Sequence, residues 1–228
     1  MSRIICIPIM TETNEAALGQ MPLCFAMADM VELRIDAIKN LDLPSLLSSP
    51  GGKVVVTNRK SDEGGWFSGN EEERVALLCE AVSMKADFID IELSTDPRLI
   101  SLLVKTVKKY GGLTQLIVSH HDFTGTPPMD ELFRIIDESY RRGADVVKIA
   151  TYARSMEDNM TILNLIGIIR RHNRNIIAFC MGETGKISRI AAPMFGSFMT
   201  FAAREKGTES APGQLTVHEI KEIFRILQ

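Results

Sequence analysis

The segment ADVVKIA, residues 144–150, has the composition of a buried strand and carries a lysine at its centre. Side chains of a strand alternate between its two faces, so Lys148 shares a face with Val146 and Ala150. A protein relieves the cost of a buried ammonium by pairing the charge or by lowering the pKa of the lysine until the amine is neutral. A neutral amine attacks carbonyl groups. From this segment alone, Lys148 is either a lysine that reaches solvent at a strand end or a nucleophile.

Other apolar segments also carry ionisable side chains. Glu32 and Arg34 lie two residues apart in VELRID, which places them on one face of a strand. The same spacing recurs on two further strands, in Asp90 with Glu92 and in Ser119 with His121. A further strand is followed closely by Arg59. Each group alone has an ordinary explanation, such as a structural ion pair, a packed histidine or a solvated strand end. Their shared position near strand ends favours one common site.

Eight short segments rich in apolar residues recur along the chain, with stretches long enough for a helix between most of them: residues 4–7, 30–35, 53–57, 88–93, 116–119, 146–150, 176–180 and 197–201. Helix starts are marked by Asn70 with Glu73 and by Thr216 with Glu219, which predict capping boxes. Asp96-Pro97 predicts a cap followed by a proline in the first turn.

Strand and helix alternate over residues 1–228 without a linker, a low-complexity tract or a repeat. This pattern predicts an α/β fold, a single (β/α)₈ (TIM) barrel forming one catalytic domain, with a doubly wound open sheet as the alternative. In a barrel the ionisable side chains converge at the rim formed by the carboxyl ends of the strands. Arg34 and Arg59 are then expected to hold the amine of Lys148 neutral, with His121 as a proton shuttle beside it.

Composition limits the classes of function. The 228 residues are 45% hydrophobic and 24% charged with a net charge of −3, so we expect a globular protein without general attraction to nucleic acid or anionic membranes. The chain shows neither a secretory leader nor a run long enough to span a bilayer, and we expect a cytoplasmic protein. The four cysteines have no metal-ligand or redox-motif spacing, which predicts reduced core thiols: Cys6, Cys24, Cys79 and Cys180.

Six regions, in order over nearly the whole chain, resemble the type I 3-dehydroquinate dehydratase family: VELRID (31–36), TNRKSDEGG (57–65), VSHHDFTGTP (118–127), ADVVKIA (144–150), MGETGKISR (181–189), and FGSFMTFA with SAPGQ (195–202 and 210–214). The resemblance implies a lyase of the shikimate pathway that removes water from 3-dehydroquinate to give 3-dehydroshikimate. It implies that Lys148 forms an imine with the substrate ketone. His121 then corresponds to the general acid and base, and Glu63 to the carboxylate that orients it.

The same resemblance implies the substrate-binding residues. Those that hold the ring hydroxyls and line the site are Glu32, Arg34 and Arg59. Those that clamp the substrate carboxylate are Arg189, Ser210 and Gln214, and those that pack against the ring are Met181 and Phe201. An arginine suits a carboxylate because its planar fork makes bidentate contacts. The chemistry requires no metal and no organic cofactor, and a homodimer is the expected assembly.

The chain also departs from the family pattern. Its first predicted strand begins almost at Met1, so we expect no N-terminal β-hairpin beneath the barrel. Phe179 stands where a methionine is common, His120 stands where an aromatic residue is common, and the stretch before APGQ is longer than usual.

Other functions remain open from the residues alone. A class I aldolase also forms an imine on a strand lysine, but it needs a phosphate site, for which the available glycines are Gly182, Gly185 and Gly196. A metal-dependent hydrolase built on residues 120–122 is disfavoured because adjacent strand residues point to opposite faces. A non-catalytic ligand-binding barrel would keep the fold without needing Lys148 and His121.

Overall fold

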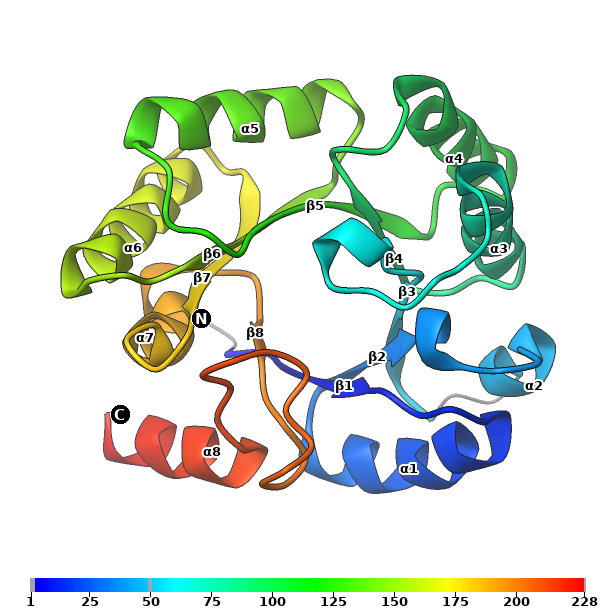
Figure 1. Cartoon of the computed structure of the whole chain (residues 1–228), viewed down its shortest axis with the longest axis horizontal. Coiled ribbons are helices and arrows are strands. Elements are labelled where there is room, and N and C mark those ends of the chain that lie inside the picture. The colour runs from blue at the N-terminus through cyan, green and yellow to red at the C-terminus, as the bar shows by residue number, and fades with distance from the viewer. Residues whose placement is uncertain (1–2, 49–50, 228) are drawn as a thin grey trace.

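Eight parallel strands alternate with helices in the computed structural model, which describes residues 3–48 and 51–227 (Figure 1). The strands are β1 (Ile5–Ile9), β2 (Met30–Arg34), β3 (Lys53–Thr57), β4 (Phe88–Glu92), β5 (Gln115–Asp122), β6 (Val146–Tyr152), β7 (Asn175–Met181) and β8 (Thr200–Phe201). The helices are α1 (Asn14–Met27), α2 (Leu43–Leu47), α3 (Glu71–Ser83), α4 (Pro97–Lys109), α5 (Met129–Arg141), α6 (Met156–Arg171), α7 (Lys186–Phe195) and α8 (Val217–Ile226), with 3₁₀ turns η1 (Ile35–Ala37) and η2 (Ser61–Glu63).

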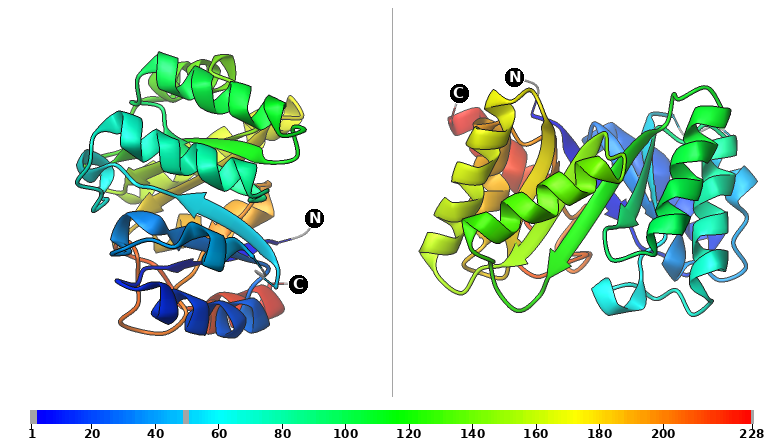
Figure 2. Two further views of the ribbon diagram at one scale, coloured as in Figure 1. Left: turned by 90° about the vertical axis from the view of Figure 1, so that its right-hand side faces the viewer. Right: turned by 90° about the horizontal axis from the view of Figure 1, so that it is seen from above.

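The strand order identifies a barrel and excludes the open-sheet alternative. Consecutive strands pair side by side from β1 to β7, and β8 pairs with the other edge of β1. The remaining seam is bridged just before β8, where the amide of Phe198 donates to the carbonyl of Ile176 in β7 at 2.7 Å. Helices surround the strands on the outside (Figure 2). The predicted (β/α)₈ barrel is therefore confirmed.

Strand β8 is shorter than predicted, because the residues before it bond to the opposite neighbour. Ser197 accepts the amide of Ala178 in β7 through its hydroxyl, which then donates to the carbonyl of Met199. Residues 200 and 201 alone pair regularly with β1. A serine side chain thus stands in for part of the ladder at the seam.

The two faces of each strand pack against different partners. On β6, Val147 and Ile149 join the apolar layer beneath the surrounding helices, which includes Ile162 of α6. Val146 and Ala150 instead belong to the cluster inside the barrel. Because side chains alternate along a strand, Lys148 projects into the barrel, as the sequence predicted.

Local sequence signals account for several helix starts. Asn70 and Glu73 form a reciprocal capping box at α3, and Thr216 and Glu219 form another at α8. Asp96 caps α4 by accepting the amide of Arg98. These predicted caps are confirmed, and they fix where each helix leaves the rim of the barrel.

The expected absence of an N-terminal β-hairpin concerns the residues that precede β1. Residues 3 and 4 precede β1 without forming a strand, and residues 1 and 2 lie outside the described residues. Within residues 3–48 and 51–227, none of the helices has the length and apolar character needed to cross a membrane.

Candidate active site

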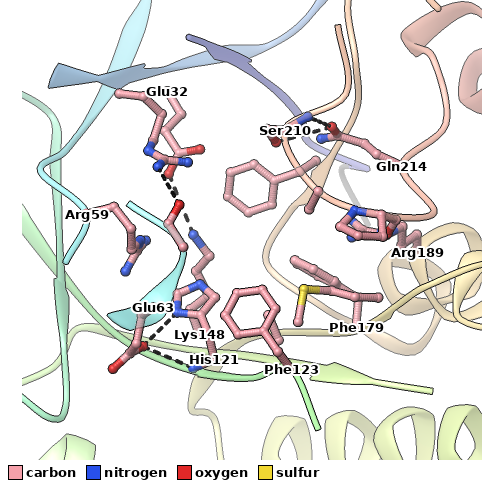
Figure 3. A pocket seen from close by; sticks show the side chains of 17 residues that line it. Glu32, Arg59, Glu63, His121, Phe123, Lys148, Phe179, Arg189, Ser210 and Gln214 are labelled. Carbon is pink, nitrogen blue, oxygen red and sulfur yellow. Dashed lines mark hydrogen bonds and ion pairs between the residues drawn. The ribbon is translucent and has the colours of Figure 1, made fainter. Parts of the chain in front are cut away.

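A cavity of about 170 Å³ opens at the carboxyl ends of the strands (Figure 3). Every residue that the sequence singled out as catalytic or substrate-binding lines it: Glu32, Arg34, Arg59, Glu63, His121, Lys148, Met181, Arg189, Phe201, Ser210 and Gln214. These residues come from strands on all sides of the barrel, from turn η2 after β3, from helix α7 and from the loop between β8 and α8. The barrel thus brings together segments that are far apart in the sequence.

Lys148 lies in the floor of this cavity and is only 5% exposed. Its Nζ atom donates to Oδ2 of Asp90 at 2.8 Å and lies 3.6 Å from Oε1 of Glu32. Its nearest charged partners are therefore carboxylates. The expectation that Arg34 and Arg59 are the charged neighbours of this amine is wrong, because the fold pairs the buried Lys148 with carboxylates.

Both arginines are directed at other groups. The Nε and Nη2 atoms of Arg34 donate to the two carboxylate oxygens of Asp36 at 2.9 and 2.8 Å. The guanidinium of Arg59 contacts Asp90 and Glu92, each at 2.9 Å, and also donates to the hydroxyl of Ser119 at 2.8 Å. Arg59 therefore binds the same carboxylate that holds the ammonium.

Asp90 is fully buried and connects these cations. Burial raises the pKa of its carboxyl, but the charges of Arg59 and Lys148 outweigh burial and lower that pKa well below its usual range. Asp90 is thus an anion near neutral pH. The hydroxyl of Ser119 donates to its Oδ1 atom at 2.6 Å, so both carboxylate oxygens have partners.

His121 forms the second reactive group. Its Nδ1 atom lies 2.9 Å from Oε2 of Glu63, which also accepts the backbone amide of His121 at 3.2 Å. Burial, followed by the charges of Arg59 and Lys148, lowers the pKa of His121 well below 6.5. The imidazole is therefore neutral near pH 7, as a general base must be.

Arg189, on helix α7, marks the opposite side of the cavity. Its guanidinium is buried, it lies 4.4 Å above the ring of Phe179, and its Nη2 atom donates to the carbonyl of Pro212 at 3.3 Å. The Nε atom is buried without a hydrogen-bond partner among the described residues. Burial lowers the pKa of Arg189 to about 10, so the group remains a cation at neutral pH. A buried cation that has no carboxylate partner in the described part of the chain suits an anionic ligand.

Gln214 adds a second available donor on this side. Its Oε1 atom accepts the amide and the hydroxyl of Ser210 at 2.7 and 3.2 Å, which fixes the orientation of the side-chain amide. Its Nε2 atom is buried and lacks a partner among residues 3–48 and 51–227. Arg189 and Gln214 both line the cavity, and each carries a buried N–H group without a partner among the described residues, which suits them to bind a carboxylate.

The loop that carries Ser210 and Gln214 packs tightly against the turn after β7. The amide of Gly182 donates to the carbonyl of Pro212 at 3.0 Å. Gly213 has φ +76°, and a Cβ atom built there would lie 2.1 Å from the carbonyl oxygen of Gly182. Glycine is therefore required at this crossing, and the contact holds the loop over the cavity.

Apolar side chains complete the wall between the two polar ends. The ring of Phe201 lies 4.5 Å from Nζ of Lys148, and Phe179 packs against it edge-on at 6.0 Å. Met181 lines the same wall, and Phe123 stacks on the imidazole of His121 at 6.4 Å. The cavity is thus suited to a small ring with a carbonyl at one end and an anionic group at the other.

Sequence reasoning left several residues of this site unassigned. Asp90 was recognised on an inner strand face without being given a role, because its pairing with Lys148 requires the curvature of the barrel. Asp36, which holds Arg34, follows it by two residues, the same spacing that links Glu32 with Arg34. Phe123 lies within the VSHHDFTGTP segment and Phe179 was noted as a departure from the family pattern, but neither was assigned to the site.

The described part of the chain contains no group of three or more His, Cys, Asp or Glu side chains arranged to hold a metal ion. His120 and His121 point to opposite faces of β5, since adjacent strand residues alternate.

Comparisons with known proteins agree with one another. A family model described as "Type I 3-dehydroquinase" matches residues 5–228. The 3-dehydroquinate dehydratase of Methanocaldococcus jannaschii is 37% identical over 224 residues, covering 98% of this chain and 99% of that protein. The crystal structure of 3-dehydroquinate dehydratase from Geobacillus kaustophilus superposes with a TM-score of 0.91 at 29% identity, covering 100% of this chain and 92% of that one. A type I enzyme from Clostridium difficile, solved with covalently modified comenic acid, gives a TM-score of 0.88 at 27% identity, covering 99% of this chain and 92% of that one.

Proposed function

The chain belongs to the type I 3-dehydroquinase family, and from this membership we propose that it dehydrates 3-dehydroquinate to 3-dehydroshikimate through an imine on Lys148. The supporting observation is that one cavity holds Lys148 and the His121–Glu63 pair on one side and the uncompensated cation of Arg189 on the other. The substrate carries a ketone and a carboxylate, which match these two sides.

Imine formation begins at Lys148. The ammonium transfers its proton to the neutral imidazole of His121 or to water, and the amine adds to the substrate ketone. The same proton then returns to the hydroxyl of the carbinolamine, which leaves as water to give an iminium, and the imidazole is neutral again. The positive iminium withdraws electrons from the adjacent carbon, so the proton on C2 becomes acidic enough for a neutral imidazole to remove.

Elimination then follows from the enamine. His121 takes the C2 proton, and the electron pair of the enamine expels the neighbouring hydroxyl, which leaves as water after receiving a proton from the same imidazole. Hydrolysis of the conjugated iminium releases the enone and regenerates Lys148. During these steps Glu63 holds the imidazole in one orientation, and it stabilises the imidazolium when it forms.

The remaining residues hold the substrate in the proposed reaction. Arg189 and Gln214 donate to the carboxylate, while Ser210 keeps the amide of Gln214 in position. Glu32 and Arg34 face the ring hydroxyls. Arg59 acts chiefly through the carboxylates it binds, because its Nη atoms are occupied by Asp90, Glu92 and Ser119. Phe201 and Met181 pack against the ring.

The aldolase alternative loses its phosphate site. The amides of Gly182, Gly185 and Gly196 each donate to a backbone carbonyl, at 3.0, 3.0 and 3.3 Å. None of these three amides is left to bind a phosphate. A non-catalytic ligand-binding barrel remains distinguishable by its failure to form an imine.

The whole barrel acts as one catalytic domain in this proposal, without a metal or an organic cofactor. We further propose a cytoplasmic homodimer. The four cysteines are free thiols and suit a reducing compartment. Exposed apolar side chains on neighbouring helices α6 and α7 suit contact with a second copy: Met156, Met160, Ile187 and Phe195. Sedimentation velocity of the pure protein tests the dimer, and a species of monomer mass at micromolar concentration contradicts it.

The reaction is tested by incubating the pure protein with 3-dehydroquinate and following the ultraviolet absorbance of the conjugated enone. The expected result is steady product formation that survives exhaustive chelation. An inactive folded protein contradicts the proposed function. Activity that chelation abolishes and a divalent cation restores contradicts the metal-free mechanism.

A further inference from the structure

Arg74 is a fully buried arginine on helix α3, outside the barrel wall. Its Nη1 atom donates to Oε2 of Glu92 at 2.7 Å and to the carbonyl of Asn58 at 2.8 Å. Its Nη2 atom donates to the hydroxyl of Thr95 at 2.7 Å, and a bidentate pair joins it to the half-buried Glu71. Arg74 does not line the cavity, so nothing so far gives it a part in the reaction.

A continuous line of opposite charges connects Arg74 with Lys148. Glu92 uses its second oxygen, Oε1, to accept from Nη1 of Arg59 at 2.9 Å. The Nη2 atom of Arg59 contacts Oδ1 of Asp90 at 2.9 Å, and Oδ2 of Asp90 holds Nζ of Lys148 at 2.8 Å. Four direct contacts therefore lead from the helix to the proposed nucleophile.

The side chains of this line are nearly shielded from water. Asp90, Glu92 and Arg74 are fully buried, Arg59 is 3% exposed and Lys148 is 5% exposed. Charges in such surroundings interact strongly because solvent screens them little. Because each ion inside the line contacts two neighbours of opposite charge, removing the charge at Arg74 changes how strongly the ammonium of Lys148 is bound.

Arg59 is the member whose contacts are divided between the two carboxylates. Its guanidinium reaches Asp90 with one nitrogen and Glu92 with another. Arg74 neutralises the far oxygen of Glu92 and so limits how strongly Glu92 attracts Arg59. Loss of the Arg74 charge would draw Arg59 toward Glu92, and Asp90 would then hold the Lys148 ammonium more tightly.

From this arrangement we propose that Arg74 is a positioning residue for Lys148, acting through Glu92, Arg59 and Asp90 to keep the ammonium loosely enough bound to release its proton. The inference rests on the proposed role of Lys148 as the imine-forming amine. The ionisable groups that face Lys148 from the elements around it are Cys6 of β1, Glu32 of β2, Arg59 after β3, Asp90 of β4 and His121 of β5.

A purely structural role is the competing explanation. Arg74 also ties helix α3 to the loop after β3 through Asn58, and its pair with Glu71 lies on the side away from the cavity. In that case substitution lowers stability without changing how the rate of imine formation depends on pH. The two explanations therefore differ in a measurable quantity.

The experiment compares the wild type with Arg74→Met, which removes the charge and keeps much of the volume, and Arg74→Lys, which keeps the charge. Glu71→Gln is the matched control, because it removes the outward partner of Arg74 and leaves the line to Lys148 intact. Each protein is incubated with 3-dehydroquinate and cyanoborohydride at a series of pH values. Intact-protein mass follows the rate at which the reduced adduct accumulates, and thermal unfolding is recorded in parallel.

Arg74→Met is expected to move the midpoint of the pH–rate curve upward by about one pH unit. The direction follows because a more tightly held ammonium loses its proton at higher pH. Arg74→Lys is expected to restore most of the shift, and Glu71→Gln to leave the midpoint unchanged. A wild-type midpoint in Arg74→Met, whatever its melting temperature, overturns the inference.

The double variant Arg74→Met with Glu92→Gln keeps the test decisive if the single variant fails to fold. It replaces both ions of the outer pair with neutral groups, so Arg59 is free to turn to Asp90. Its midpoint is expected below that of the wild type, because Arg59 then competes with Lys148 for Asp90, and a midpoint at or above the wild-type value contradicts the inference. A wild type that forms no adduct refutes the proposed function itself, whereas a wild-type adduct with unmoved midpoints refutes only the role of Arg74.

Discussion

Glu63 holds His121 at two points with one carboxylate oxygen: Oε2 lies 2.9 Å from the ring Nδ1 atom and 3.2 Å from the backbone nitrogen. The other oxygen accepts the hydroxyl of Ser94 at 2.6 Å. A carboxylate only accepts hydrogen bonds, so Nδ1 carries the proton and Nε2 is left with its lone pair. Glu63 thereby selects the tautomer in which Nε2 is the base.

Glu63→Gln is expected to reduce kcat by on the order of 10²-fold, at the lower end of what a general base contributes. The amide no longer favours one tautomer, and it does not stabilise the imidazolium. Steady-state kinetics should show KM changing much less than kcat. Ser94→Ala is the matched control, since it removes a contact to Glu63 but leaves the imidazole bond in place. Equal losses in both variants would contradict the role of Glu63.

Lys148→Ala and His121→Ala should fail at different stages. With substrate and borohydride, the wild type is expected to gain the mass of a reduced ligand on Lys148 and to lose activity. Lys148→Ala should gain no mass and show almost no turnover. His121→Ala should still form the adduct while kcat falls about 10²- to 10⁴-fold, because the base acts mainly after the ketone is captured. Peptide mapping that finds the adduct on another lysine would remove Lys148 from the mechanism.

Arg189→Ala should weaken substrate binding strongly, by on the order of 2 to 5 kcal/mol, because the substrate carboxylate would be buried without its partner. Arg189→Lys should recover part of this loss, since an ammonium keeps the charge and lacks the fork. Because turnover enters KM, the affinity is best read by calorimetry in a Lys148→Ala background. Wild-type affinity in both variants would show that another residue binds the carboxylate.

The imidazole of His121 should titrate well below pH 6.5 in the ligand-free protein, since burial and two nearby cations oppose its protonation. NMR titration, with His121→Ala to identify the signal, measures this directly. The unfolded chain takes up this proton near pH 6.5 and the folded protein only at lower pH. This group therefore makes the free energy of unfolding decrease as pH falls below 6.5. A midpoint at or above 6.5 would contradict the prediction.

The fold was largely predictable because its signals are local. The apolar segments of strand length and the capping pairs of α3 and α8 each involve only a few neighbouring residues. Their alternation without a linker indicated a single domain. The seam between β7 and β8 was not predictable in the same way. There the hydroxyl of Ser197 replaces a backbone hydrogen bond of the sheet. The sequence does not indicate whether Ser197 and Phe198 bond to strand β7 or to strand β1.

The membership of the cavity was predictable, but its electrostatics were not. Alternation along strands places Glu32, Arg34 and Lys148 on inner faces, whatever their partners. The partners depend on distances across the barrel, and these give Lys148 two carboxylates where the sequence suggested two arginines. Arg34 and Arg59 were placed near the site correctly, yet each is held by acidic residues that the sequence left without a role.

Trp66 follows the turn that carries Glu63 and Gly64, and it stacks over Arg34 with 5.4 Å between the guanidinium carbon and the ring. It is the single tryptophan of the chain and is 56% exposed. All indole emission of the chain therefore comes from this position at the rim. A rearrangement of Arg34, or of the loop at residues 209–214 that lies near Trp66, would alter the intrinsic fluorescence. The protein therefore carries an optical probe of rearrangements at the rim, usable in stopped-flow experiments without a label.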